Sequence, residues 1–234
     1  AAIIASLVIV RLLIATSIGH GMIARTVGNL QISGQSVEIT GLSGDPLSEF
    51  RIERVSISDK DGIWLTADNL QIDWRGLSLL RRNLNIQSLN IQNITARREP
   101  ILENGNDGER KRSSNMPFHK ITIDQLEAES VMLGKDVLPG GASFSFVSSL
   151  RYGEPSGNFV LELVPTEGPQ DKVSANIQWT PDSGLGGDLF VRGTSDGWLS
   201  RVMRFSNGEN FEIRGNADGI AQNWTATTEL LINE

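Results

Sequence analysis

The sequence has no cysteine, two histidines, one tyrosine and no excess of basic residues. The absence of cysteine excludes disulfides, zinc–thiolate sites and thiol nucleophiles together. The 21 Lys and Arg residues face 28 Asp and Glu residues, which gives a net charge of −7. Nucleic-acid binding favours a basic surface, so it is not expected here. The chain has 24 glycines and 8 prolines among its 234 residues, so a collagen-like or low-complexity chain is also excluded.

Residues 1–24 form a long apolar run in which Arg11 is the charged side chain. Because about 20 apolar residues suffice to span a bilayer, the run predicts a transmembrane helix, with a membrane anchor and following helix over 1–28. The chain begins with Ala, and we expect residues upstream that start the span earlier and place Arg11 near an interface. A cleaved signal peptide and a buried core helix are the alternatives.

The same run contains G-x-G-x-x-A, the dinucleotide-binding fingerprint, from Gly19 to Ala24, with Glu38 downstream. This fingerprint binds a pyrophosphate where it joins a parallel strand to a helix inside alternating β and α units. The sequence that follows does not alternate in this way. A nucleotide cofactor is therefore not expected.

From residue 30 onward, apolar residues alternate with polar ones, as in Leu70, Ile72 and Trp74. A period of 2 predicts half-buried strands, and polar residues at the alternate positions predict an antiparallel sheet with one face in water. A hydrophobic fraction of 39% is that of a folded chain, here mainly β with short helices. Later strands are expected at 142–150, 158–164, 172–179, 185–192, 211–217 and 224–232. They form a meander that a helix near 196–204, capped by Asp196, interrupts.

One spacing, apolar-x-apolar-x-x-apolar-x-apolar, recurs along the chain. Its copies begin at Phe50, Leu65, Leu84 and Ile121. The two-residue gap moves the following side chains to the opposite face of a strand, so a bulge or bend is needed to keep all four apolar residues on one side. We therefore expect a strongly curved, open sheet built from repeated units of about one hairpin.

Residues 99–117 break the strand pattern with charged and polar side chains and no aromatic residue. They predict a polar loop between a first β segment at 29–98 and a second at 118–234. The basic triplet at 110–112 could contact a lipid headgroup, but solvation is the expected role of such a charge run. Strand-like sequence continues to residue 234, so we expect further chain that covers the open edge of the sheet.

Two short motifs match catalytic or metal sites. GTSDG at 193–197 fits the G-x-S-x-G nucleophile elbow, but the base must follow Ser195 in chain order, and both His20 and His119 precede it. A turn that starts a helix explains the same residues. DKDG at 59–62 lacks the acidic ladder of a calcium loop and is expected to be a hairpin turn. We therefore expect no enzyme, and no catalytic residue, metal site or cofactor.

Four short segments follow one another closely around Trp64. They are IWL at 63–65, LQIDWR at 70–75, LSLLR at 77–81 and LNIQSL at 84–89. This succession resembles the N-terminal region of the TamB family of translocation and assembly subunits, within the AsmA-like group, where an anchor precedes a strand ending in Leu-Asp-Trp, a leucine-rich turn and a further strand. Ile72 in place of that Leu, Asn83 in place of a Gly and the polar loop depart from the family pattern.

The resemblance implies a single-pass inner-membrane protein whose bulk forms an open, taco-like β-groove in the periplasm. Such a groove is expected to conduct phospholipids between the inner and outer membranes without making or breaking a bond. The candidate lipid-contacting residues are Ile72, Trp74, Ile86, Leu89 and Ile91. The alternative function is the assembly of outer-membrane proteins together with an outer-membrane barrel partner, TamA. Periodicity leaves open whether the apolar face is a lipid groove or a sealed core.

Overall fold

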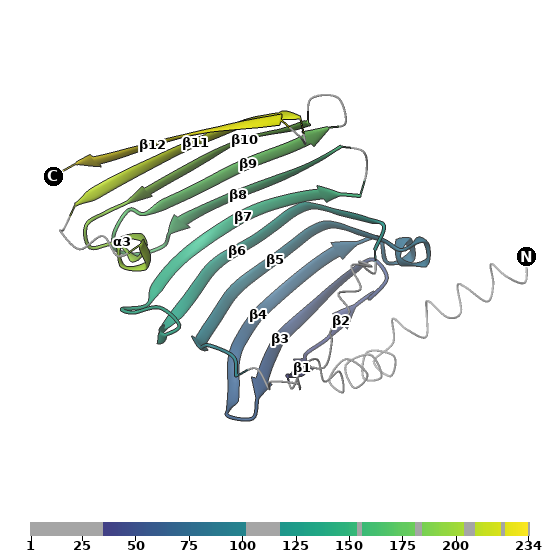
Figure 1. Ribbon diagram of the computed structural model, residues 1–234. Helices are drawn as coiled ribbons and strands as arrows, with labels where there is room; N and C mark the ends of the chain where they lie inside the picture. Colours follow the sequence, from purple (N-terminus) through teal and green to yellow (C-terminus); the bar gives the residue numbers. More distant parts are fainter. Residues whose placement is uncertain are drawn as a thin grey trace, which may run out of the picture.

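The described part of the chain forms one twelve-stranded sheet in which neighbouring strands follow chain order from β3 to β12. The computed structural model describes residues 35–101, 118–153, 156–180, 184–203, 209–220 and 223–233. Figure 1 shows the strands side by side and curved along their length, with β12 at one edge and β1 and β2 next to β3 at the other. The expected mainly β, curved architecture is confirmed.

The strands of the first half of the sheet are β1 (Ser36–Thr40), β2 (Ser43–Gly44), β3 (Glu49–Asp59), β4 (Gly62–Trp74), β5 (Asn83–Arg98), β6 (Lys120–Asp136) and β7 (Ala142–Tyr152). Those of the second half are β8 (Gly157–Pro165), β9 (Lys172–Thr180), β10 (Gly184–Gly193), β11 (Asn210–Ile220) and β12 (Asn223–Asn233). Two short helices, η1 (Gly76–Arg81) after β4 and α3 (Trp198–Met203) after β10, lie at opposite ends of the strands (Figure 1).

One strand pair departs from the expected antiparallel meander. β5 and β6 are parallel, with Ile86 opposite Ile123 and Ile91 opposite Ala128, whereas the other neighbouring strands are antiparallel. A parallel pair requires the chain to return along the whole strand, which for β5 is about 50 Å. Residues 99–119 can span about 70 Å when extended, so their length permits this return. The predicted loop therefore acts as a crossover rather than as a hairpin connection.

The repeated apolar spacing is a structural unit of the sheet. Cross-strand partners place its copies in register, with Phe50, Ile72, Leu89 and Leu126 in one row and Ile52, Leu70, Ile91 and Ala128 in the next. The ladder of paired residues leaves out Glu53 and Asn69, which lie in the gaps of the first two copies. It also leaves out Gln92 and Glu129, which directly follow the last apolar residue of the other two copies. These positions are aligned from β3 to β6. The predicted bend is thus confirmed as a line that crosses the sheet.

A hairpin turn at Lys60 and Asp61 connects β3 to β4, as the DKDG segment predicts. Asp59 accepts hydrogen bonds from the backbone N–H groups of Asp61, at 2.9 Å, and Ile101, at 2.7 Å. Arg98 binds the same carboxylate through both terminal nitrogens, at 2.7 and 2.5 Å. The hydrogen bond from Arg98 is the main reason why the pKa of the Asp59 carboxyl lies well below its usual range. This ion pair ties the turn to the end of β5.

Several sequence expectations lie outside the described residues. These are the anchor at 1–28, the fingerprint at 19–24 with His20, and most of the polar loop, at 102–117. Glu38, which would accompany the fingerprint, lies in β1 opposite Ser56. Among the residues that the structure describes, no helix has the length and apolar character needed to cross a membrane.

Candidate functional site

Alternate residues of β3 to β12 place hydrophobic side chains on one face of the sheet, here called the apolar face. Its central row takes one residue from each strand, in pairwise register: Ile52, Leu70, Ile91, Ala128, Phe146, Leu163, Val173, Val191, Ile213 and Leu230. Every member of this row is hydrophobic. Because neighbouring strands lie about 4.8 Å apart, the row extends for about 43 Å across the sheet.

The five lipid-contact candidates from the sequence all lie on the apolar face. Ile72 is opposite Leu89 and Trp74 is opposite Ile86, while Ile91 belongs to the central row. Ile91 is buried, and the other four side chains are half-buried. The structure therefore brings these residues together on adjacent strands, in a part of the face that is largely shielded from solvent.

The loop before β3 covers one end of this face. Trp74 Nε1 donates a hydrogen bond to the backbone oxygen of Pro46 at 2.9 Å. The Trp74 ring also meets Phe50 edge-on, with ring centroids 6.2 Å apart. The backbone N–H of Gly76 donates to Leu47 O at 2.9 Å, which holds the loop against the end of β4. Trp74 therefore contacts the loop and Phe50 and also contributes to the apolar face.

On β3 to β7, here called the closed region, the apolar side chains pack against one another. Ala67, Ile91, Ala128 and Val131 form a buried cluster. The hydrophobic residues packed around it are Val55, Leu70, Leu89, Ile94, Leu126, Leu133, Phe144 and Phe146. The cluster spans the bend, since Ala128 and Val131 stand on either side of Glu129. The bend therefore brings neighbouring rows of the apolar face into contact.

On β8 to β12, here called the open region, the central row is half-buried as far as Ile213, and other residues of the same face are exposed. Leu189 is 43% exposed and Leu230 is 50% exposed. Gly187 and Gly215, which have no side chain, occupy positions of this face next to Leu189. A hollow of about 290 Å³ forms there, lined mainly by apolar groups that include Ile177, Leu185, Leu189, Ala217 and Ala226. Sequence periodicity is the same in this part of the face and in the closed region, so it does not distinguish them.

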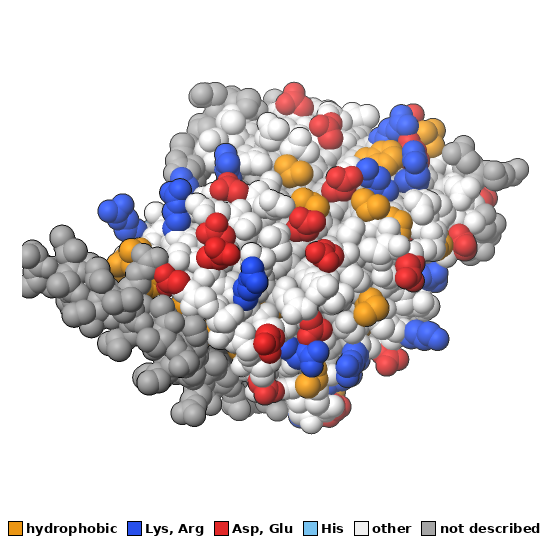
Figure 2. All heavy atoms as spheres, turned by 180° about the vertical axis from the view of Figure 1, so that it is seen from behind, with side chains coloured by type: hydrophobic (Ala, Val, Ile, Leu, Met, Phe, Trp, Pro, Cys, Tyr) orange, Lys and Arg blue, Asp and Glu red, His pale blue; other side chains and the backbone are white. Residues whose placement is uncertain are grey.

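The opposite side of the sheet, here called the polar face, carries the charged residues. Figure 2 shows acidic and basic side chains scattered over one side of the molecule, with hydrophobic side chains isolated among them. Several charges are paired across strands, such as Lys172 with Glu162 at 2.7 Å and Arg151 with Asp124 at 3.0 Å. Exposed pairs of this kind contribute little to stability. The alternation of apolar and polar residues thus separates two chemically distinct faces.

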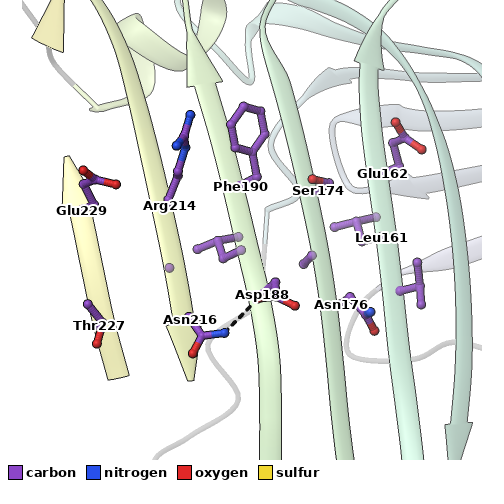
Figure 3. A pocket seen from close by; sticks show the side chains of 14 residues that line it. Leu161, Glu162, Ser174, Asn176, Asp188, Phe190, Arg214, Asn216, Thr227 and Glu229 are labelled. Atoms are coloured by element: carbon purple, nitrogen blue, oxygen red, sulfur yellow. Dashed lines mark hydrogen bonds between the residues drawn. The ribbon is translucent and has the colours of Figure 1, made fainter. Parts of the chain in front are cut away.

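A second hollow, of about 530 Å³, lies over β8 to β12 and is lined mainly by residues of the polar face, with Leu161 and Leu189 also contributing (Figure 3). Asn216 Nδ2 donates to Asp188 Oδ1 at 2.9 Å within it. Nearby, Glu212 is bound by Arg192 and Arg214. Burial, the largest single effect, raises the pKa of Glu212, but the hydrogen bonds from both arginines outweigh it and lower the pKa overall. Arg214, which lines this hollow, is thus already engaged in an ion pair with Glu212.

The GTSDG segment is a structural turn. Asp171 is 1% exposed and accepts hydrogen bonds from the backbone N–H of Thr194, the hydroxyl of Thr194 and the backbone N–H of Leu199, each at 2.8 Å. The expected cap, Asp196, is exposed, so the helix is capped by Asp171, which precedes β9. Sequence patterns around the helix could not reveal this contact. Ser195 is also exposed, and its backbone N–H donates to Asn210 Oδ1 at 3.0 Å.

Within the described ranges, no group of three or more His, Asp or Glu side chains could hold a metal ion. No protein-family model matches the sequence, and no match was found among curated proteins or among solved structures. The family resemblance around Trp64 therefore stays an expectation. The continuous apolar face, closed on β3 to β7 and open on β8 to β12, is the candidate functional site.

Proposed function

We propose that this chain conducts phospholipids along its apolar face between two membranes, with no bond made or broken. The observation that supports the proposal is the hydrophobic row from β3 to β12. At about 43 Å it is longer than one leaflet of acyl chains, which is about 15 Å thick, or half of a bilayer core. A surface of this length suits a path better than a pocket for one molecule.

The open region supplies a physical reason for lipid contact. Leu189 and Leu230 expose about half of their surface, and water-exposed apolar area costs about 25 cal/mol per Å² relative to burial. Acyl chains would cover this area and occupy the hollow beside Leu189. In this proposal, residues 1–28 anchor the chain in the inner membrane and the sheet lies in the periplasm, as the resemblance around Trp64 implies.

An assembly function together with an outer-membrane barrel protein such as TamA is the second candidate. The observation that favours it is the edge of the sheet at β12. Within the described residues β12 pairs with β11 alone, and its described side chains are exposed. An unpaired strand edge can add a strand from another protein. Strand addition would therefore use this edge, whereas lipid conduction would use the apolar face.

Site-specific photo-crosslinking in cells distinguishes the two functions. A photoreactive side chain at Leu189, on the apolar face, should capture phospholipid, because acyl chains would fill the hollow there. The same side chain at the adjacent Asp188 should not, since neighbouring strand residues point to opposite faces. A second pair, Ile86 and Asn85, tests whether lipid also reaches β5. Equal lipid capture at Leu189 and Asp188, or capture of protein without lipid at Leu189, would contradict the proposal.

A further inference from the structure

The short helix η1 exposes three leucines at one end of the sheet. Leu77 is 56% exposed, Leu79 38% and Leu80 82%. Single exposed hydrophobic side chains are common on protein surfaces, but three within one six-residue helix form a local apolar projection. These three residues are called the leucine tip.

Basic residues surround the leucine tip. Arg75 precedes η1, Arg81 ends it and Arg82 follows it, and all three are exposed. Arg75 also lines a polar hollow of about 540 Å³ together with Lys120 and Arg151. Arg151 pairs with Asp124 at 3.0 Å. We call these five cations the basic collar; they gather at one place on a chain whose net charge is −7.

Aromatic side chains lie at the same end of the sheet. Tyr152, the last residue of β7, is 42% exposed, and its ring centroid is 6.4 Å from that of Trp179. Trp179 lies opposite Gly157, the first residue of β8. Tyr and Trp favour the boundary between the headgroups and the hydrocarbon of a bilayer. This end therefore combines the aliphatic, basic and aromatic side chains that are enriched at membrane interfaces.

The sheet holds the leucine tip in place. The backbone N–H of Arg82 donates to Leu79 O at 2.9 Å, and Arg82 O accepts from the backbone N–H of His119 at 2.8 Å. Ser78 Oγ donates to Asn83 O at 2.7 Å. These bonds join η1 to β5 and to the start of β6, so the leucines project from a fixed support.

We propose that the leucine tip and the basic collar dock this end of the sheet on an anionic lipid bilayer. The leucines enter the boundary between headgroups and acyl chains, and the arginines contact lipid phosphates. The charge of the collar favours an anionic bilayer over a neutral one. This docking does not depend on lipid moving along the apolar face, so either proposal can fail without the other.

The test uses the full chain, whose lack of cysteine allows one labelled position at a time. Leu80→Cys carries an environment-sensitive NBD dye, and the protein is reconstituted into phosphatidylcholine vesicles with or without about 30% phosphatidylglycerol. Residues 1–24 can hold the chain in either vesicle, so the dye reports where η1 lies rather than whether the chain is bound. We expect a blue shift and a roughly two-fold rise in emission with phosphatidylglycerol, reversed by about 0.5 M salt.

Lys60→Cys, on the turn at the opposite end of β4, is the matched control and should not respond. Arg75→Gln with Arg81→Gln should remove the effect of phosphatidylglycerol at position 80 without unfolding the protein, because both side chains are exposed. Identical emission at position 80 in both vesicles would overturn the proposal. Disulfide-linked dimers of unlabelled Leu80→Cys, with unchanged dye emission, would overturn it in favour of a second copy.

Discussion

The closed and open regions share one sequence pattern but differ in what covers their apolar side chains. In the closed region, Ala128 is 0% exposed and lies in the central row of the apolar face. In the open region, Leu230 belongs to the same row and is 50% exposed. Strict alternation of apolar and polar residues therefore fixes which face a side chain occupies. It does not fix whether that face is shielded from water.

The difference arises from the length and bending of the strands. β4 to β6 have 13, 16 and 17 residues, and the line of unpaired positions bends them so that neighbouring rows touch. β8 to β10 have 9, 9 and 10 residues. Glycines at 187 and 215 also withhold side chains from the open face. The bend of the long strands thus brings their apolar side chains into a core, and the hollow lies over β9 to β12, whose pairing continues without such a line of gaps.

The largest expected difference between the regions comes from adding a charge to each. Ile91→Asp places an unpaired carboxylate in the buried cluster and should lower the free energy of unfolding by about 4 kcal/mol. Leu189→Asp, at an exposed position of the same face, should lower it by less than about 1 kcal/mol. Denaturant titration of the two variants measures both values. Similar losses in the two variants would show that the open region is also packed in solution.

A smaller effect is expected at α3, which bridges the two regions. Trp198 stacks on Phe144 of the closed region with ring centroids 5.7 Å apart, and Asp171 holds the start of the helix. Asp171→Ala leaves buried donors without partners and should lower the free energy of unfolding by about 2 kcal/mol. Asp196→Ala is the matched control and should change it by less than about 0.5 kcal/mol. Thermal denaturation compares the two, and a larger effect of Asp196→Ala would contradict the observed cap.

The smallest expected effect concerns two carboxylates whose pKa values are lowered. Asp59 is bound by Arg98 in the closed region, and Glu212 by Arg192 and Arg214 in the open region. The lowered pKa means that each pair stabilises the fold near neutral pH and that this contribution is lost as the pH falls below about 4. Asp59→Asn should therefore lower Tm at pH 7, and this loss should shrink progressively as the pH falls from about 4 towards the lowered pKa of Asp59.

Glu212→Gln should lower Tm less than Asp59→Asn does. The Arg192 and Arg214 side chains are 55% and 59% exposed, against 23% for Arg98, so solvent screens them more strongly. Melting curves at several pH values measure both substitutions. A loss of Tm at Asp59→Asn that does not shrink at all as the pH falls below about 4 would show that the ion pair is not its source.

Local patterns predicted many elements of the fold. Alternation located the strands, the DKDG turn was placed between β3 and β4, and the repeated spacing indicated a bend that passes through Asn69. These succeed because side-chain direction and turn geometry depend on adjacent residues. The cap from Asp171 and the parallel pairing of β5 with β6 were missed, because each depends on residues far apart in the chain.

The candidate site was predicted in part. Ile72, Trp74, Ile86, Leu89 and Ile91 share the face that alternation assigned to them. Leu189 and Leu230, two exposed hydrophobic members of the open region's face, are not distinguished by any local pattern. The glycines at 187 and 215 are a sequence signal that could identify this exposed part of the face, because a residue without a side chain in the middle of a strand leaves its neighbours less covered.

The sequence by itself determined the class of fold and the two faces of the sheet, because a period of 2 sends alternate side chains to opposite sides whatever the strands pair with. It also determined the charge and the lack of thiol chemistry. Only the tertiary structure decided that β5 and β6 run parallel and that η1 exposes its leucines. It also decided that the Ala128 side chain is buried whereas that of Leu230 is exposed. Burial is a property of what surrounds a side chain, and those surroundings are set by the register and curvature of the whole sheet.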